Sequence, residues 1–150
     1  MEDKTPISPP TVLGLYDRPM WNSIRARAMR LQQCNQCLTF RYPPGPTCGS
    51  CLSIDFEWQA ISGKASIWSW VVFHRQYLEA YPTPYNVISI QLEEGPLMVS
   101  NLAGLEPTGS WIGQAVEICY VTLKDGTVLP RFRLIQLSVF KWFETDGLIS

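Results

Sequence analysis

The sequence has little charge and a single histidine. Lys and Arg number 12, Asp and Glu number 13, and charged residues make up 17% of the 150 residues, where about 25% is usual for a globular domain. The net charge of −1 argues against a broad basic face for nucleic acid. Aromatic residues reach 12%. Few charges with many aromatic rings favour a permanent protein partner, because interfaces have this composition.

Long apolar runs are also missing. None approaches the roughly 18 residues that a membrane-spanning helix needs, and the longest, from Ile67 to Phe73, is interrupted by Ser69. Residues 1–6 are polar and end at a proline, so no signal peptide is expected there. We therefore expect a cytoplasmic protein without a membrane span, whose cysteines stay reduced.

One helix is predicted near the N-terminus. Residues 1–15 are rich in proline and form an irregular lead-in, and Asp17 is a plausible N-cap. Apolar residues then recur at spacings of three and four, as on one face of a helix. They are Trp21, Ile24, Ala28 and Leu31. A helix over about 18–30 is the expectation.

Strand-like segments follow the first third of the chain. Residues 65–73 are apolar on both faces, with Ile67, Val71 and Phe73 expected on one of them. This strand should therefore be covered on both faces, by its own chain or by another. Residues 87–93 alternate between apolar and polar. Further strands are expected at 97–103, around 116–120 and at 128–135. Antiparallel strands joined by Gly, Pro and Asp turns predict a small barrel or sandwich.

Four of the five cysteines form two Cys-x2-Cys pairs. Cys34 and Cys37 are separated by ten residues from Cys48 and Cys51. Two such knuckles on a short hairpin close a tetrahedron of sulfur around a metal ion, typically Zn²⁺. Four thiolates leave no position for a water, so the predicted site is structural, one Zn²⁺ per chain. Iron in a rubredoxin-like site uses the same ligands and stays open.

Other roles for these cysteines are less favoured. Two disulfides do not suit a reducing compartment, and a thioredoxin-type redox pair needs one knuckle in a βαβ setting. Leu38 and Leu52 follow the second cysteine of each knuckle, where glycine is often found.

The order of short motifs resembles a known family, the rubredoxin-like zinc ribbon joined to an OB-fold in acyl-CoA-associated proteins. The resemblance runs from about Trp21 to Leu134. Gly45 stands where the family often has a basic residue after paired prolines. The motifs are Phe40-x-Tyr42-Pro43-Pro44, Phe56-Glu57-Trp58, Ser62-Gly63-Lys64-Ala65, Pro84-Tyr85-Asn86-Val87, Leu92-Glu93-Glu94-Gly95 and Leu129-Pro130-x-Phe132, together with the four cysteines.

The resemblance implies an α+β chain that is mainly β. It has an N-terminal extension and helix over 1–30, a zinc ribbon over 31–58, a five-stranded OB-fold barrel over 59–138 and a tail over 139–150. Members of the family look like non-catalytic companions of thiolase-superfamily enzymes: thiolases, lipid-transfer-protein-type aldolases, acyltransferases or hydroxymethylglutaryl-CoA synthases. Some accompany or are fused to enoyl-CoA hydratase-like domains. An acyl-CoA shared with such an enzyme, in a hetero-oligomer, is the implied ligand.

Two sets of side chains are candidates for these contacts. Basic and aromatic residues suited to an acyl-CoA are Arg41, Lys64, His74, Arg75 and Tyr85. Tryptophans suited to a partner surface are Trp21, Trp68, Trp70 and Trp142. His74 with Cys119 as a catalytic pair is disfavoured, because a mid-strand cysteine is usually buried and inert.

A second class of function stays open on composition. Zinc ribbons and OB-folds also bind single-stranded nucleic acid, through aromatic rings in a basic groove. The rings are present, whereas the net charge of −1 gives no sign of the groove. Binding of that kind weakens steeply with salt, which separates it from acyl-CoA binding.

Overall fold

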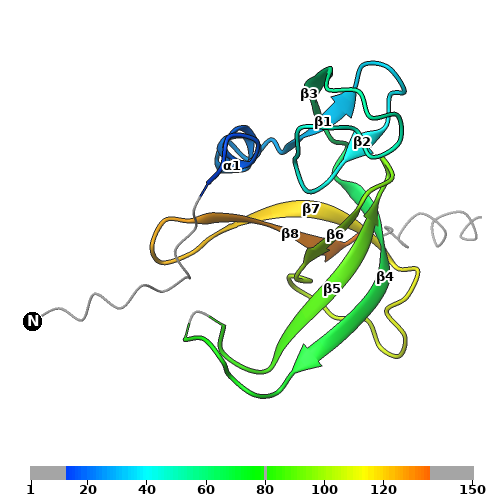
Figure 1. Cartoon of the computed structure of the whole chain (residues 1–150). Coiled ribbons are helices and arrows are strands. Elements are labelled where there is room, and N and C mark those ends of the chain that lie inside the picture. Colours follow the sequence, from blue (N-terminus) through cyan, green and yellow to red (C-terminus); the bar gives the residue numbers. More distant parts are fainter. Residues whose placement is uncertain (1–12, 80, 136–150) are drawn as a thin grey trace, which may run out of the picture.

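The computed structural model describes residues 13–79 and 81–135. One short helix precedes eight strands, and Figure 1 shows the strands in two groups, one above the other. The elements are α1 (Asp17–Arg25), β1 (Arg30–Cys34), β2 (Phe40–Arg41), β3 (Phe56–Ala60), β4 (Lys64–Phe73), β5 (Tyr85–Leu92), β6 (Leu97–Ser100), β7 (Ala115–Thr122) and β8 (Val128–Leu134). Within the described residues, no helix has the length and apolarity needed to cross a membrane.

The helix is shorter than its apolar spacing predicts. It ends at Arg25, and Arg27 has a φ of 59°, which a right-handed helix does not contain. Leu31, which continues the helical spacing of apolar residues, lies in β1 opposite Gln59 of β3, so pairing between strands overrides that spacing. The N-cap is Tyr16 without a side-chain cap, and not the expected Asp17, which is the first helical residue.

The smaller sheet carries the cysteine knuckles. Its strand order is β2-β1-β3, and both pairs are antiparallel. Because β3 pairs with β1 along its whole length, from Arg30 opposite Ala60 to Cys34 opposite Phe56, residues 56–60 belong to this sheet. The division into a ribbon over 31–58 and a barrel over 59–138 stays a prediction.

The larger sheet has five antiparallel strands in the order β6-β5-β4-β7-β8. It curls until Leu102, just after β6, forms a bridge with Phe132 of β8. The two outer strands also meet through the Ser100 hydroxyl, which donates to the Pro130 carbonyl at 2.9 Å. A mainly β chain with one helix, a cysteine cluster and a five-stranded OB-like half-barrel confirms the predicted fold class.

A β-bulge in β4 changes which residues share a face. The register with β5 shifts between Ile67, opposite Ile90, and Ser69, opposite Ser89, so Trp68 is an extra residue. Ile67 therefore shares the inner face with Trp70, and Val71 lies on the outer face. The prediction that Ile67, Val71 and Phe73 share one face is wrong, because simple alternation does not survive an inserted residue.

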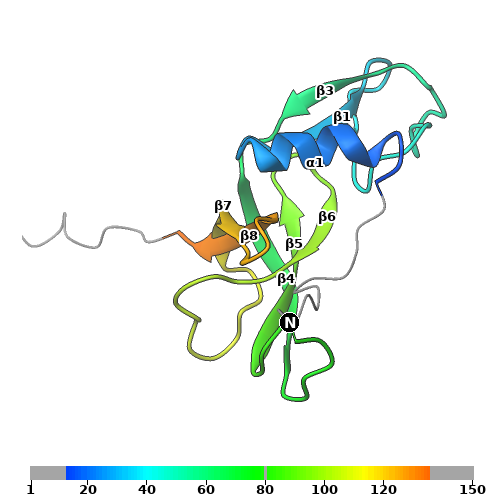
Figure 2. The ribbon, with the colours of Figure 1, turned by 90° about the vertical axis from the view of Figure 1, so that its left-hand side faces the viewer.

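The two sheets and the helix share one hydrophobic core. Met20 and Ile24 of α1 and Leu31 of β1 belong to the same buried cluster as Ile90 and Phe132 of the barrel. Figure 2 shows α1 lying across one end of the barrel, next to β1. Two hydrogen bonds connect the segment between α1 and β1 to β7. The backbone N–H of Met29 donates to the Tyr120 hydroxyl at 2.8 Å, and the Arg27 guanidinium donates to the Thr122 hydroxyl at 2.9 Å.

Candidate metal centre and ligand-facing residues

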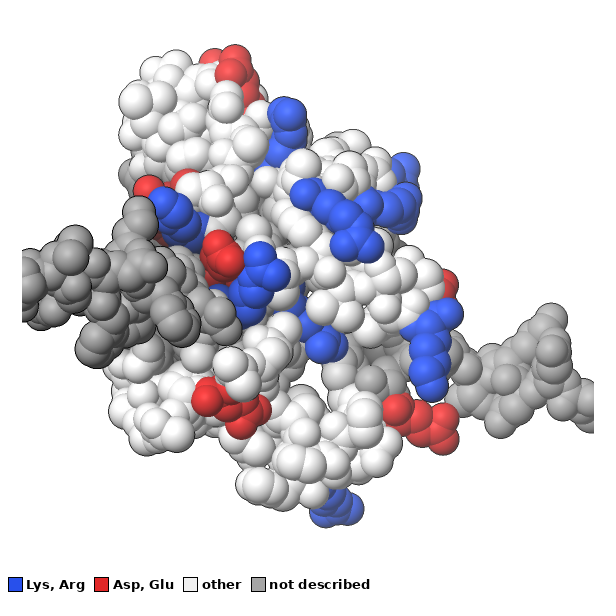
Figure 3. All heavy atoms as spheres, turned by 180° about the vertical axis from the view of Figure 1, so that it is seen from behind, with Lys and Arg blue, Asp and Glu red and all other residues white. Residues whose placement is uncertain are grey.

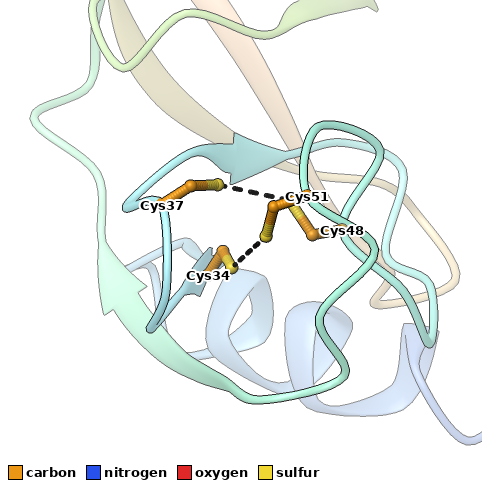
Figure 4. Close-up of side chains that lie close together, drawn as sticks. All are labelled: Cys34, Cys37, Cys48 and Cys51. Atoms are coloured by element: carbon orange, nitrogen blue, oxygen red, sulfur yellow. Dashed lines mark hydrogen bonds between the residues drawn. The ribbon is translucent and has the colours of Figure 1, made fainter.

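The four cysteines of the two knuckles converge on one point. Their sulfur atoms all lie within 4.8 Å of one another, with 3.5 Å between Cys34 and Cys51 and 3.5 Å between Cys37 and Cys48 (Figure 4). Disulfide sulfurs lie about 2.05 Å apart, so these cysteines are free thiols. A tetrahedron with Zn–S bonds of about 2.3 Å has sulfurs about 3.8 Å apart, which matches this spacing.

The backbone of the two knuckles repeats the same turn. The N–H of Leu38 donates to the Cys34 carbonyl at 2.9 Å, and the N–H of Leu52 donates to the Cys48 carbonyl at 3.0 Å. Each first cysteine in turn donates its own N–H, Cys34 to Thr39 at 3.0 Å and Cys48 to Ser53 at 2.9 Å. Leu38 and Leu52 adopt the left-handed backbone conformation that glycine often adopts at these positions. The absence of glycine therefore does not disrupt the knuckles.

Backbone N–H groups prepare two of the four thiols, those of Cys34 and Cys48, for a cation. They hold the pKa of Cys48 down to about 6, with the N–H of Cys51 the largest contribution and that of Ser50 the next. The pKa of Cys34 is lowered chiefly by the backbone N–H of Cys37. A thiolate is the form that binds metal, so these groups lower the cost of deprotonation.

The donor set fits a structural Zn²⁺. Cys34, Cys37, Cys48 and Cys51 would hold the ion, which would join two knuckles that have no apolar core between them. With four sulfur ligands no site remains for a water or substrate, so the ion would supply folding stability and no reaction chemistry.

Two of the acyl-CoA candidates lie on either side of the turn between β5 and β6. Arg41 lines a hollow of about 550 Å³ that Gly95 also lines, and Lys64 lines a second hollow of about 480 Å³ beside the same glycine. One Arg41 nitrogen donates to the Gly45 carbonyl at 3.0 Å, and the guanidinium lies 5.2 Å from the centre of the Phe56 ring. Its Nε and second terminal nitrogen are buried without a hydrogen-bond partner among the described residues.

The other three candidates lie at the far end of β4 and β5. The Tyr85 ring stacks on Phe73 at 4.9 Å, His74 follows the end of β4, and the Arg75 guanidinium lies 5.4 Å from the centre of the Tyr77 ring. β4 runs over ten residues from Lys64 to Phe73, so this end lies about 30 Å from Lys64 at the usual rise per residue. The structure therefore brings the five candidates together as two groups and not as one site.

The predicted partner tryptophans differ in their surroundings. Trp21 and Trp70 pack against the core, and Trp70 stacks on Trp111 at 5.7 Å. Trp68 is exposed, and its Nε1 donates to the Gln91 side chain at 2.9 Å. Trp142 lies outside the described residues.

Cys119 is apart from the knuckles, in β7 opposite Arg131. Burial raises its pKa, so it is a thiol at neutral pH and a poor nucleophile.

Comparisons with known proteins identify relatives of this chain. The sequence profile of the "ChsH2, C-terminal OB-fold domain" matches residues 58–121. A "DUF35 domain-containing scaffold protein" of Pyrococcus furiosus is 32% identical over 99 residues, which is 61% of this chain and 71% of that one. A "Probable enoyl-CoA hydratase alpha subunit" of Thermomonospora curvata is 33% identical over 118 residues, 78% of this chain and 37% of that one.

A solved structure resembles the chain over most of its length. The chain from the "Ltp2-ChsH2(DUF35) aldolase" superposes with a TM-score of 0.76 and 30% identity, over 83% of this chain and 98% of that one. The molecule is thus a four-cysteine module on an OB-like barrel. The chain belongs to the DUF35 family, which confirms the resemblance found from its motifs.

The curated hydratase relatives are longer proteins. The chain spans 37% of the Thermomonospora curvata subunit and 33% of the "3-oxo-4,17-pregnadiene-20-carboxyl-CoA hydratase alpha subunit" of Mycobacterium tuberculosis, to which it is 28% identical.

Sequence reasoning missed the exposed apolar residues on the outer side of the barrel. Val71, Leu97 and Val99 are exposed there. The sequence carried two signals, the apolar segment 97–103 and the complete lack of charge in 65–73, but the bulge that turns Val71 outward leaves no mark in the residue pattern.

Proposed function

We propose that this chain is a non-catalytic accessory subunit that binds and supports a thiolase-superfamily enzyme in the cytoplasm. One observation carries the proposal: the chain superposes on almost the whole of the DUF35 chain of an Ltp2 aldolase, with a TM-score of 0.76 over 98% of that chain. The name "scaffold protein" given to the Pyrococcus furiosus relative agrees with such a role.

The four-cysteine cluster would bind one structural Zn²⁺. The spacing of the sulfurs, the lowered pKa of Cys48 and the repeated knuckle turns support this assignment. Metal analysis of protein purified from the native host would show one zinc per chain. Iron would give instead a coloured protein with charge-transfer absorption in the visible range.

An acyl-CoA shared with the partner is the proposed ligand. Two relatives are named for CoA thioester chemistry, and Arg41 and Lys64 offer positive charge beside one turn. Tyr85 and Arg75 belong to the second group, so a single ligand would need to lie along β4 to touch both groups.

The chain is proposed to make and break no bonds itself. Cys119 is held as a thiol by burial, and the single histidine, His74, is exposed directly after the end of β4. Hydration of an enoyl-CoA is the competing activity, because two longer relatives carry that name. The isolated chain should show no hydratase activity, and activity abolished by His74→Ala would overturn the proposal.

Co-expression with thiolase-superfamily proteins encoded in the same genome tests the central claim. We expect one of them to co-elute with the chain at a fixed ratio, and the complex to bind an acyl-CoA in calorimetry. A chain that binds none of these proteins, and instead binds single-stranded polynucleotide in a salt-dependent way, would contradict the proposal.

A further inference from the structure

The outer side of the β4–β5–β6 part of the barrel forms an uncharged surface on which most side chains are apolar. Strand register places its residues side by side: Val71 lies opposite Val87, Ser89 lies opposite Val99, and Gln91 lies opposite Leu97. We call this surface the outer sheet face. Its members are Trp68, Ser69, Val71, Val87, Ser89, Gln91, Leu97 and Val99.

Large apolar side chains on this face are open to solvent. The exposed fraction is 64% for Val99, 54% for Trp68, 52% for Val71 and 47% for Leu97. The other members of the face are Val87, two serines and a glutamine, and none of them carries a charge. Several large apolar side chains exposed together on neighbouring strands are uncommon on a monomer and mark an interaction site.

The bulge in β4 builds this surface. It turns Val71 outward, and it places Trp68 where its indole Nε1 donates to Gln91 of the neighbouring strand at 2.9 Å. That bond ties the exposed indole to β5. An aromatic ring fixed before binding loses little conformational freedom on contact, which suits an interface anchor.

Charge is absent from the outer sheet face and present elsewhere on the barrel. Residues 65–73, 85–92 and 97–103 contain no Asp, Glu, Lys or Arg. On the outward side of β7 and β8, by contrast, Arg133 forms an ion pair with Glu117 at 3.0 Å. Figure 3 shows charged side chains of both signs interspersed on the face that it presents. Depletion of charge over an apolar patch is the composition of the buried centre of a protein interface.

We propose that the outer sheet face is the surface on which the thiolase-superfamily subunit docks, through an apolar and uncharged patch of that subunit. This inference rests on the proposed function. The occupant follows from the aldolase named with the superposed DUF35 chain and from the neutrality of the face, which offers nothing to pair with a charged partner residue.

Single charges placed on the face test the proposal. Val71→Asp and Val99→Asp each place a carboxylate at a position that is already solvent-exposed in the free chain, so folding should persist. In the complex each carboxylate would be buried without a partner. We expect the affinity for the co-expressed subunit to fall about 100-fold or more in each variant, with the melting temperature of the free chain nearly unchanged.

Leu105→Asp is the matched control. Leu105 is 71% exposed, and it lines a hollow with Glu117 and Arg133, away from the outer sheet face. Its affinity should match that of the wild type. Equal binding by the wild type and both valine variants would overturn this docking face while leaving the proposed function intact.

Two further outcomes distinguish the remaining occupants. A wild-type chain that binds no thiolase-superfamily protein would sink the proposed function, and this inference with it. A wild-type chain that is a dimer in light scattering, and that Val99→Asp converts to a monomer without affecting partner binding, would show that a second copy covers the face, which also overturns the inference.

Discussion

Leu38 and Leu52 have the same backbone conformation, with φ angles of 63° and 64°, and each follows the second cysteine of its knuckle. Both side chains are exposed, at 66% and 75%. An L-residue in this left-handed region is strained by contact between its Cβ and the next carbonyl, and glycine is not. The two knuckles therefore tolerate a backbone cost that their side chains do little to offset in the free chain.

Replacing either leucine with glycine should stabilise the protein. For Leu38→Gly and Leu52→Gly we expect the free energy of unfolding to rise by about 0.5–1 kcal/mol each, since relief of strain exceeds the extra entropy of unfolded glycine. Urea denaturation of the metal-bound protein measures the change. A loss of stability in both variants would mean that the leucine side chains make contacts that matter more than the backbone.

Among the glycines that the structure describes, Gly63 has the tightest surroundings. It has a φ of +82°, and a Cβ added there would lie 2.5 Å from Cγ2 of Ile118. Gly63→Ala should therefore cost about 2–4 kcal/mol, from the left-handed backbone and from overpacking together. Gly109→Ala is the control, because Gly109 has a φ of +78° with no atom within 4 Å of the added Cβ. It should lose only the backbone part, about 1–2 kcal/mol, and equal losses would show that Ile118 moves aside freely.

Removal of the metal should unfold the cysteine module. A strong chelator would remove the ion, and Cys51→Ser removes one of its four ligands. Metal binding supplies folding free energy on the order of 10 kcal/mol in zinc-finger peptides. We expect zinc content by mass spectrometry to fall below one per chain and the melting temperature to drop. Cys119→Ser, which touches none of the four sulfurs, should keep both. An unchanged melting temperature for metal-free protein would contradict a structural role.

High pH should destabilise the fold through Tyr42. Burial raises the pKa of this phenol above 10, and the negative charge of Asp17 acts in the same direction. Above pH 10 the unfolded chain loses the proton first and so binds fewer protons than the folded chain, and stability falls as pH rises. The free energy of unfolding should be lower at about pH 11 than at about pH 9. The decline should be shallower in Tyr42→Phe, and an identical slope would exclude Tyr42 as its source.

The sequence was most informative where chemistry requires particular residues at a fixed spacing. The two Cys-x2-Cys pairs predicted a convergent cluster, and the sulfurs do converge. The alternation of Ile88, Ile90 and Leu92 predicted an inward face, and all three are buried. In these places the local pattern and the tertiary contacts agree.

Prediction failed where a tertiary contact overrides the local pattern. Leu31 continues the helical spacing from Trp21, yet strand pairing with Gln59 takes it into β1. Nor does any residue type announce the bulge at Trp68, which falls just beyond the residues of β4 that pair with β7. The acyl-CoA candidates form two separate groups because they lie at opposite ends of β4. The sequence predicts the position of this strand, but it does not show which residues lie beside each end.

The common core has a consequence for protein engineering. Met20 and Leu31 sit in the same cluster as Ile90 and Phe132, so no line can be drawn between the cysteine module and the barrel without exposing side chains from both. In a chimaera that exchanges only the metal-binding hairpin between relatives, core residues from one protein would pack poorly against those of the other. Transplants should carry the helix along with β1, and laboratory evolution that alters one half should select compensating changes in the other.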